Sequence, residues 1–187
     1  MENRRDDVTR FVEFLSFTTA RPVRRGQSQG SQLIEFKIVP LVERPDLADQ
    51  VAVWGFGEWG HLNPGETLAG RKVRIRGKLN VDRVPMCFVA LDGKGDLVGT
   101  ASLIFDDLEG DPRNPWLASV FVPAGQRKKG IASALVGAVE AAAKRLGYER
   151  LYLFTSTAPA LYAGLGWSAL ERLDYRGEHV LVMDKTL

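Results

Sequence analysis

The sequence predicts an α+β domain of the mixed α/β type, and three stretches carry this prediction. Two apolar runs, 86–92 and 97–105, flank the turn residues Gly-Lys-Gly-Asp, which is the pattern of a β-hairpin. A helix is predicted over 130–146, where apolar residues recur at helical spacing. A second hairpin pattern closes the chain over 168–187. Strands that first form a meander and then alternate with helices indicate one mixed domain.

The first residues of the chain differ in composition from the rest. We expect residues 1–32 to be an N-terminal extension, partly flexible, because the stretch RPVRRGQSQGSQ at 21–32 has the composition of a linker. The domain is then expected to span 33–187. It opens with strand composition at 33–42, followed by a helix pattern over 43–59 that has proline near its first turn.

The next segment is ambiguous. Asn63 is predicted to cap a helix, with Glu66 at the capping-box position. Residues 70–80 alternate apolar and charged side chains as in a strand, yet their leucine and isoleucine positions also fit a helix. Six basic residues against one acid between Arg71 and Arg83 form a strip that either meets an acidic substrate or is a solvated face.

The second half of the chain is clearer. Pro115 forces the residue before it to be extended, and 116–122 follows as a strand. A short buried strand is predicted over 150–155 and a short helix over 158–166. The closing hairpin is expected to turn near Gly177.

The helix predicted over 130–146 carries its own local signals. Glu140 stands four residues before Lys144, the favourable order for an ion pair along a helix. Gly147 is the expected C-terminal stop.

Composition excludes several classes of protein. A chain of 187 residues with a net charge of +2 offers no bulk charge for nucleic acid or a membrane surface. The single cysteine, Cys87, has apolar neighbours and is expected to be a core thiol, and no Cys/His spacing typical of a metal site is present. Without an apolar run of about 18 residues or a secretory signal pattern, a cytoplasmic protein is expected.

The stretch before the 130–146 helix is locally unfavourable. Three cations, residues 127–129, precede Gly130 and oppose the positive end of the helix dipole. Gly125 and Gly130 have the spacing of a P-loop, but Ile131 and Ala132 stand where that motif needs Lys and Ser/Thr, so the P-loop is excluded. Two interpretations remain: a phosphate or pyrophosphate site at a helix N-terminus, or a solvated basic turn.

Three motifs in the same order resemble those of the GNAT superfamily of acyl-CoA-dependent N-acyltransferases. VFVPAGQRKKGIASALV, residues 120–136, is similar to motif A, in which a V-x-V strand leads into R/Q-x-x-G-x-G/A. LYAGLGW at 161–167 resembles the downstream Y-x-x-L/F-G-W/F motif, and YRGEHVLVM at 175–183 resembles a frequent closing hairpin. The resemblance covers 33–187 and implies a mostly antiparallel sheet, splayed where acyl-CoA binds and flanked by helices.

The resemblance also implies which residues hold acetyl-CoA. The backbone of the splayed strand would pair with the pantetheine arm, and the N–H groups of the loop would hold the pyrophosphate while two cations add charge. The strand residues are Val120, Phe121 and Val122; the N–H groups are those of Lys128, Gly130, Ile131 and Ala132; the cations are Arg127 and Lys129. No metal is implied.

Amine acetylation needs a base for the nucleophile and an acid for the departing thiolate. Tyr162 matches the position of the family's general acid. Many members carry a glutamate on the strand before motif A, and this chain has none there. Asp107 is therefore ranked first as base or as the group that binds the cationic amine, ahead of other carboxylates: Asp106, Glu109 and Glu58.

The sequence thus predicts an acetyl-CoA-dependent N-acetyltransferase that acts in a ternary complex. The acceptor is a primary amine of a small molecule or of a peptide or protein N-terminus, and nucleic acid and membrane are not expected partners. The alternative is a non-catalytic acyl-CoA-binding sensor or scaffold module. A homodimer stays open.

Overall fold

The computed structural model describes residues 35–187, so the predicted extension at 1–32 and the first two residues of the predicted domain lie outside the described part. The strands are β1 (Phe36–Pro40), β2 (Met86–Asp92), β3 (Leu97–Ile104), β4 (Trp116–Phe121), β5 (Arg150–Thr155), β6 (Ser168–Tyr175) and β7 (Glu178–Thr186). They form one seven-stranded sheet in the order β1-β2-β3-β4-β5-β7-β6. Every neighbouring pair is antiparallel except β4 and β5.

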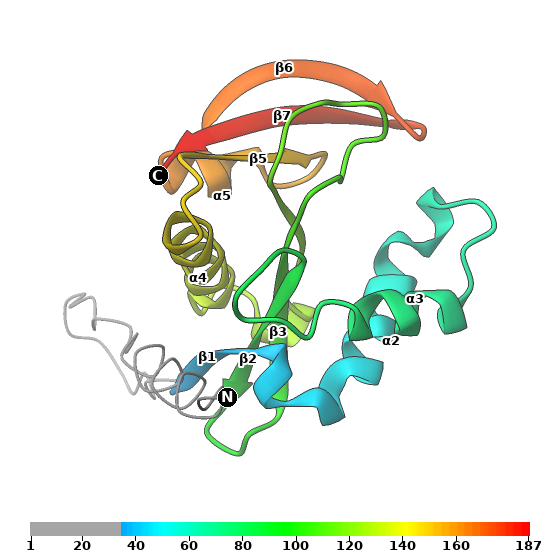
Figure 1. The fold of residues 1–187 in the computed structure, drawn as a ribbon, viewed down its shortest axis with the longest axis vertical. Helices are drawn as coiled ribbons and strands as arrows, with labels where there is room; N and C mark the ends of the chain where they lie inside the picture. The colour runs from blue at the N-terminus through cyan, green and yellow to red at the C-terminus, as the bar shows by residue number, and fades with distance from the viewer. Residues whose placement is uncertain (1–34) are drawn as a thin grey trace, which may run out of the picture.

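Helices cover both faces of this sheet. They are α2 (Ala48–Trp59), α3 (Leu68–Arg76), α4 (Ile131–Arg145) and α5 (Pro159–Gly164), joined by the 3-10 turns η1 (Leu41–Glu43), η2 (Pro45–Leu47), η3 (Gly60–Leu62) and η4 (Ala124–Gln126). In Figure 1, α4 lies on one side of β2 and β3, and α2 and α3 lie on the other. The predicted fold class, a mostly antiparallel sheet flanked by helices, is confirmed.

The sheet separates two main hydrophobic clusters because side chains of a strand alternate between its faces. Phe88 and Leu103 point to the α4 face, where they pack with α4 and α5 residues. Cys87 and Val89 point to the opposite face, under α2. Cys87 is fully buried, as expected of a core thiol, and its Sγ lies 3.3 Å from Thr100 Oγ1.

Helix α3 begins later than predicted. Its N-cap is Thr67, whose Oγ1 accepts the N–H of Gly70 at 3.1 Å. The predicted cap, Asn63, ends η3 instead and donates its side-chain amide to the Trp59 carbonyl at 2.8 Å. Glu66 was wrongly predicted at a capping-box position, because its carboxylate turns toward the arginines of α3.

A buried ion pair forms within this segment and lies against α2. Arg71 is only 9% exposed and donates to Glu66 through Nε at 2.9 Å and Nη2 at 2.5 Å; Arg74 pairs with the same carboxylate. Gly55 of α2 makes room, because a Cβ there would lie 2.9 Å from Nη1 of Arg71. Loss of Glu66 would leave a buried charge without its counter-ion, which is strongly destabilising.

Further ion pairs explain why residues 70–76 of the ambiguous segment are helical. Lys72 and Arg76 are four residues apart, so a helix places both beside Asp49 of α2, at 2.9 and 2.5 Å. In a strand, two residues four positions apart would be too far from each other along the chain to contact the same carboxylate. Five of the strip's six cations are therefore in ion pairs with carboxylates of the described residues, and Lys78 is the exception; the five are Arg71, Lys72, Arg74, Arg76 and Arg83.

We predict that Gly99→Ala destabilises the fold by about 1–3 kcal/mol, as overpacked cores do. A Cβ at Gly99 in β3 would lie 2.9 Å from both Ile131 and Leu135, where the first turns of α4 pack on the sheet. Gly137→Ala is the matched control, since a Cβ there meets nothing within 4 Å and alanine favours a helix interior by roughly 0.5–1 kcal/mol. Urea unfolding measures both; equal stability of the two variants would contradict the prediction.

Candidate active site

Strands β4 and β5 separate almost as soon as they meet. Their one register pair is Trp116 with Tyr152, supported by the Tyr152 N–H donating to the Pro115 carbonyl at 3.1 Å. Beyond it, residues 117–121 have no partner in β5. The β5-facing backbone edge of these residues is therefore left open inside the sheet, as an edge to which an extended ligand can add.

A β-bulge in β4 accounts for the separation. Phe121 lies opposite Thr100 and Ala118 opposite Ser102, so between these two pairs β4 advances by three residues while β3 advances by two. Ser119 takes up the extra residue with a φ of 54°, a conformation uncommon outside glycine. A bulge bends its strand and re-aims the backbone groups beside it.

The N-terminus of α4 follows directly after β4 and η4. Gly130 is its N-cap, with a φ of 81° that glycine adopts without strain. The first helical hydrogen bond runs from the Ala134 N–H to the Gly130 carbonyl at 3.0 Å. The N–H groups of residues 128–133, including those of Ile131 and Ala132, find no acceptor within 35–187. Free N–H groups at the positive end of a helix dipole form an anion site.

The three cations of this loop differ in their surroundings. Arg127 donates from Nε to the Val122 carbonyl at 2.9 Å, so it fastens the loop to the end of β4. Lys129 donates to Gln126 Oε1 at 2.7 Å. Lys128 is exposed and holds a φ of 63°. The positive charge predicted for a pyrophosphate is present, and part of it also shapes the loop.

The predicted strand residues point to different surroundings. Val120 packs against the α4-side core and Val122 is buried in it. Phe121 points to the opposite face, where its ring centroid lies 5.3 Å from that of Trp54 and 6.3 Å from that of Trp59. An aromatic cluster from α2 thus covers the far side of the open strand.

Tyr162 lies in α5, which follows β5. Its side chain is 8% exposed, and its ring meets that of Trp167 edge-on at 6.2 Å. Burial raises the pKa of the Tyr162 hydroxyl to about 12. No residue of 35–187 hydrogen-bonds to this hydroxyl. In that range every side-chain oxygen that is fully shielded from solvent does have a hydrogen-bond partner. The hydroxyl is therefore not enclosed, and stays protonated at neutral pH.

Glu140 of α4 holds the segment after Tyr162 in place. It accepts from Trp167 Nε1 and from Lys185 Nζ, each at 2.8 Å, and Lys185 also donates to the Leu165 carbonyl at 2.8 Å. Both Leu165 and Trp167 donate their backbone N–H to the Tyr162 carbonyl. This network explains why a tryptophan ends the Y-x-x-L-G-W stretch.

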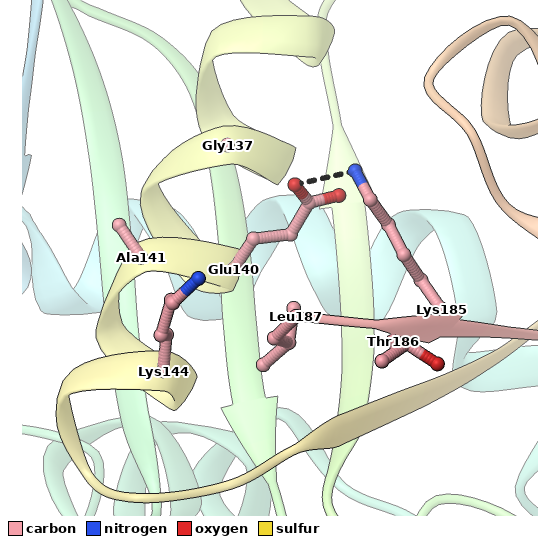
Figure 2. A pocket seen from close by; sticks show the side chains of 7 residues that line it. All are labelled: Gly137, Glu140, Ala141, Lys144, Lys185, Thr186 and Leu187. Carbon is pink, nitrogen blue, oxygen red and sulfur yellow. Dashed lines mark hydrogen bonds and ion pairs between the residues drawn. The ribbon is translucent and has the colours of Figure 1, made fainter.

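The predicted pair between Glu140 and Lys144 was wrong, because the Glu140 carboxylate pairs with Trp167 Nε1 and Lys185 Nζ instead. Figure 2 shows the Glu140–Lys185 pair bridging α4 and β7, with no such link to Lys144. Glu140 and Lys144 both line a pocket of about 300 Å³, together with Gly137, Ala141, Lys185, Thr186 and Leu187. None of the predicted site residues contributes to it.

Asp107 lies in the loop between β3 and β4. It is half-buried, and burial raises the pKa of its carboxyl to about 6, against the opposing effects of Lys78 and Arg176. The other candidate carboxylates, Asp106, Glu109 and Glu58, are exposed. Glu109 pairs with Arg176 at 3.3 Å.

The structure brings most predicted residues together but divides them between two faces. Val122, Ile131 and Tyr162 share one core cluster, which joins the end of β4, the start of α4 and α5. Asp107 lies outside that cluster. Sequence inspection missed Lys78, whose contact with the buried Ser102 hydroxyl no local pattern signals. Within the described range no His, Cys, Asp or Glu cluster fits a metal ion, and no helix is long and apolar enough to cross a membrane.

Comparison with known proteins gives a consistent result. The profile described as the Acetyltransferase (GNAT) family matches residues 56–167. A GNAT-family acetyltransferase from Streptococcus pneumoniae is 16% identical, with a TM-score of 0.62 over 82% of this chain and 99% of that one. The NatC complex bound to Gag peptide and CoA gives the same four values. An aminoglycoside 6'-N-acetyltransferase complexed with coenzyme A is 18% identical, with a TM-score of 0.60 over 80% and 96%. No curated protein matches.

We predict that Glu140→Ala lowers the free energy of unfolding by about 1–3 kcal/mol, because Trp167 Nε1 and the Lys185 ammonium both lose their acceptor. Lys144→Ala, one turn along the same helix, serves as the control and should change stability by less than about 0.5 kcal/mol. Chemical denaturation followed by Trp fluorescence measures both. A Glu140 variant as stable as the control contradicts the role of this network.

Proposed function

Because the chain belongs to the acetyltransferase (GNAT) family, we propose that it moves the acetyl group of acetyl-CoA to a primary amine by direct attack in a ternary complex. The observation that carries the proposal is the open edge of β4 running straight into free N–H groups at the start of α4. The open strand edge suits an extended chain with amide groups, and the helix start suits a dianion. Acetyl-CoA contains both, in that order.

Acetyl-CoA would lie between β4 and β5. The backbone of Val120, Phe121 and Val122 would pair with the amides of its pantetheine arm, as a neighbouring strand would. Its pyrophosphate would accept from the N–H groups of four residues, with charge from Arg127 and Lys129; the four are Lys128, Gly130, Ile131 and Ala132. Small side chains at the helix start support this, because they let phosphate oxygens approach the backbone.

The reaction needs three groups of the protein. The Asp107 carboxylate would take the proton of the acceptor ammonium, directly or through water, and the freed nitrogen would attack the thioester carbonyl. A backbone N–H beside the bulge at Ser119 would donate to the oxyanion. As the tetrahedral intermediate collapses, Tyr162 would give its hydroxyl proton to the departing thiolate. Tyr162 is suited to this because burial keeps it protonated.

The acceptor is a primary amine of a small molecule or of a peptide or protein N-terminus. The related folds include one bound to a Gag peptide and one that acetylates aminoglycosides, and each supports one of these choices. The domain boundaries, 33–187 for the acyltransferase and 1–32 for an extension, belong to the same proposal.

A second function is favoured by one observation. Many family members place their catalytic base on the strand that corresponds to β4, and β4 of this chain carries no carboxylate. A module that binds acyl-CoA without turnover would need the open edge and the helix start but neither Asp107 nor Tyr162.

A panel of amines with acetyl-CoA, read out by thiol release, separates the two functions. The panel includes aminoglycosides, amino acids, polyamines and peptides with free N-termini. Amine-dependent thiol release supports the transferase. Binding of CoA in calorimetry without release for any amine supports the module, and absence of both binding and release contradicts the whole proposal.

We predict that Tyr162→Phe lowers kcat by about 10²-fold or more, because the thiolate loses its proton donor. The dissociation constant for CoA should stay within about twofold, since the ring and its packing on Trp167 remain. Tyr148→Phe, which alters a partly buried tyrosine outside the proposed machinery, should keep wild-type kcat. Wild-type turnover in Tyr162→Phe would assign the proton transfer to another group.

The pH dependence tests Asp107. Below a pH of about 6 its carboxyl is protonated and cannot accept a proton, so kcat/KM should fall tenfold per pH unit there. Asp107→Asn should lose activity and this acid limb together, while Asp106→Asn at the exposed neighbour keeps both. An unchanged acid limb in Asp107→Asn means that the titrating base is a different residue.

A further inference from the structure

Lys78 is a half-buried cation with no carboxylate in contact. It follows α3, and its Nζ donates to Ser102 Oγ at 3.1 Å. Burial lowers the pKa of the Lys78 ammonium. No carboxylate of residues 35–187 lies within ion-pair distance of it. The Ser102 hydroxyl that it meets is buried, and a charge placed largely out of water against a neutral hydroxyl is unfavourable; such groups gather at functional sites.

Asp107 is the matching anion. The Asp107 carboxyl has neither a hydrogen bond nor an ion pair to residues 35–187, although burial disfavours its charge. Since no enclosed side-chain oxygen in that range is left unpaired, this carboxyl remains reachable by a ligand. Lys78 and Asp107 each favour the charged form of the other, yet they do not touch. Two opposite charges are thus held apart.

The other charges near this pair are already matched. Arg71 and Arg74, which oppose the charge on Lys78, both bind Glu66. Arg176, which faces Asp107 from the β6–β7 turn, binds Glu109 and Asn63. The Cys87 thiol also faces Lys78, and burial raises its pKa, so it stays neutral.

The location of the pair links it to the open strand. Ser102, which holds Lys78, is paired across the sheet with Ala118 of β4, the residue before the bulge at Ser119. The Lys78 ammonium therefore lies one strand away from the place where β4 leaves β5. Asp107 belongs to the loop that leads from β3 into β4.

We propose, resting on the function proposed above, that Lys78 and Asp107 bind an acceptor whose amine stands next to a carboxylate, as in an amino acid. The ammonium of such a zwitterion would face Asp107 and its carboxylate would face Lys78, so that each half-buried charge gains its counter-ion. An alkylamine would neutralise Asp107 but leave Lys78 without an anion. The aromatic rings of Trp54 and Trp59 lie on the same face and would border the acceptor's side chain.

Matched acceptor pairs test this directly. Each pair is an amino acid and its decarboxylated amine, for example phenylalanine with phenethylamine and leucine with isoamylamine, assayed with acetyl-CoA on the full chain. We expect kcat/KM to be at least tenfold higher for the carboxylate member of the preferred pair. An equal or higher value for the decarboxylated members overturns the inference.

Variants then assign the preference to Lys78. Lys78→Met should remove the carboxylate preference while CoA affinity stays unchanged, and Lys78→Arg should retain part of it. Lys72→Met, in α3 and paired to Asp49, should keep the full preference. A preference that survives in folded Lys78→Met contradicts the inference. If Lys78→Met does not fold, the matched pairs on wild type and Lys78→Arg decide instead.

The two proposals fail in different ways. If no amine releases thiol from acetyl-CoA, the transferase itself is wrong. If amines are acetylated and the carboxylate gives no advantage, only the inference about Lys78 and Asp107 is wrong.

Discussion

One extra residue in β4 is the constraint on which the rest of the structure depends. With Ser119 inserted, the strand keeps its pairing with β3 but turns its other edge away from β5 after a single register pair. Parallel strands of a sheet normally pair along their length, and an unpaired edge inside a sheet leaves backbone groups without partners. β5 stays in the sheet through its other edge, which pairs with β7, and β4 leads at once into a helix start that also has unpaired N–H groups.

Electrostatics gives the second half of the account. Cations beside the N-terminus of a helix cost about 0.3–1 kcal/mol each, and three of them precede α4. Arg127 and Lys129 recover part of that through hydrogen bonds within the loop. A bound dianion would make the electrostatic energy of this loop favourable, since it attracts both the cations and the positive end of the helix dipole. Lys78 and Asp107, on the opposite face, are likewise charges without a counter-ion in the folded chain, and they too lie beside the open strand.

Much of this could be predicted from the sequence, because the signals are local. The hairpins, the α4 helix and the three motifs depend on spacings of a few residues, and the mostly antiparallel sheet and family followed from them. The errors have different causes. Glu140 pairs with Trp167 and Lys185 instead of Lys144, and these partners lie 27 and 45 residues away, beyond any local pattern. Glu66 pairs with Arg71, only five residues on, because α3 is capped by Thr67 and not by Asn63. The bulge has no residue signature, since Ser119 is neither glycine nor asparagine. The isolation of Lys78 emerges only once its neighbours have found other partners.

Amide hydrogen exchange with and without coenzyme A tests the central claim most directly, because it reports on the backbone groups themselves. If the β4 edge and the α4 start together hold the ligand, amides of 117–122 and 128–133 gain protection at saturating CoA, while those at the centre of β2 stay unchanged. Protection confined to other segments, or none at all, would contradict the account.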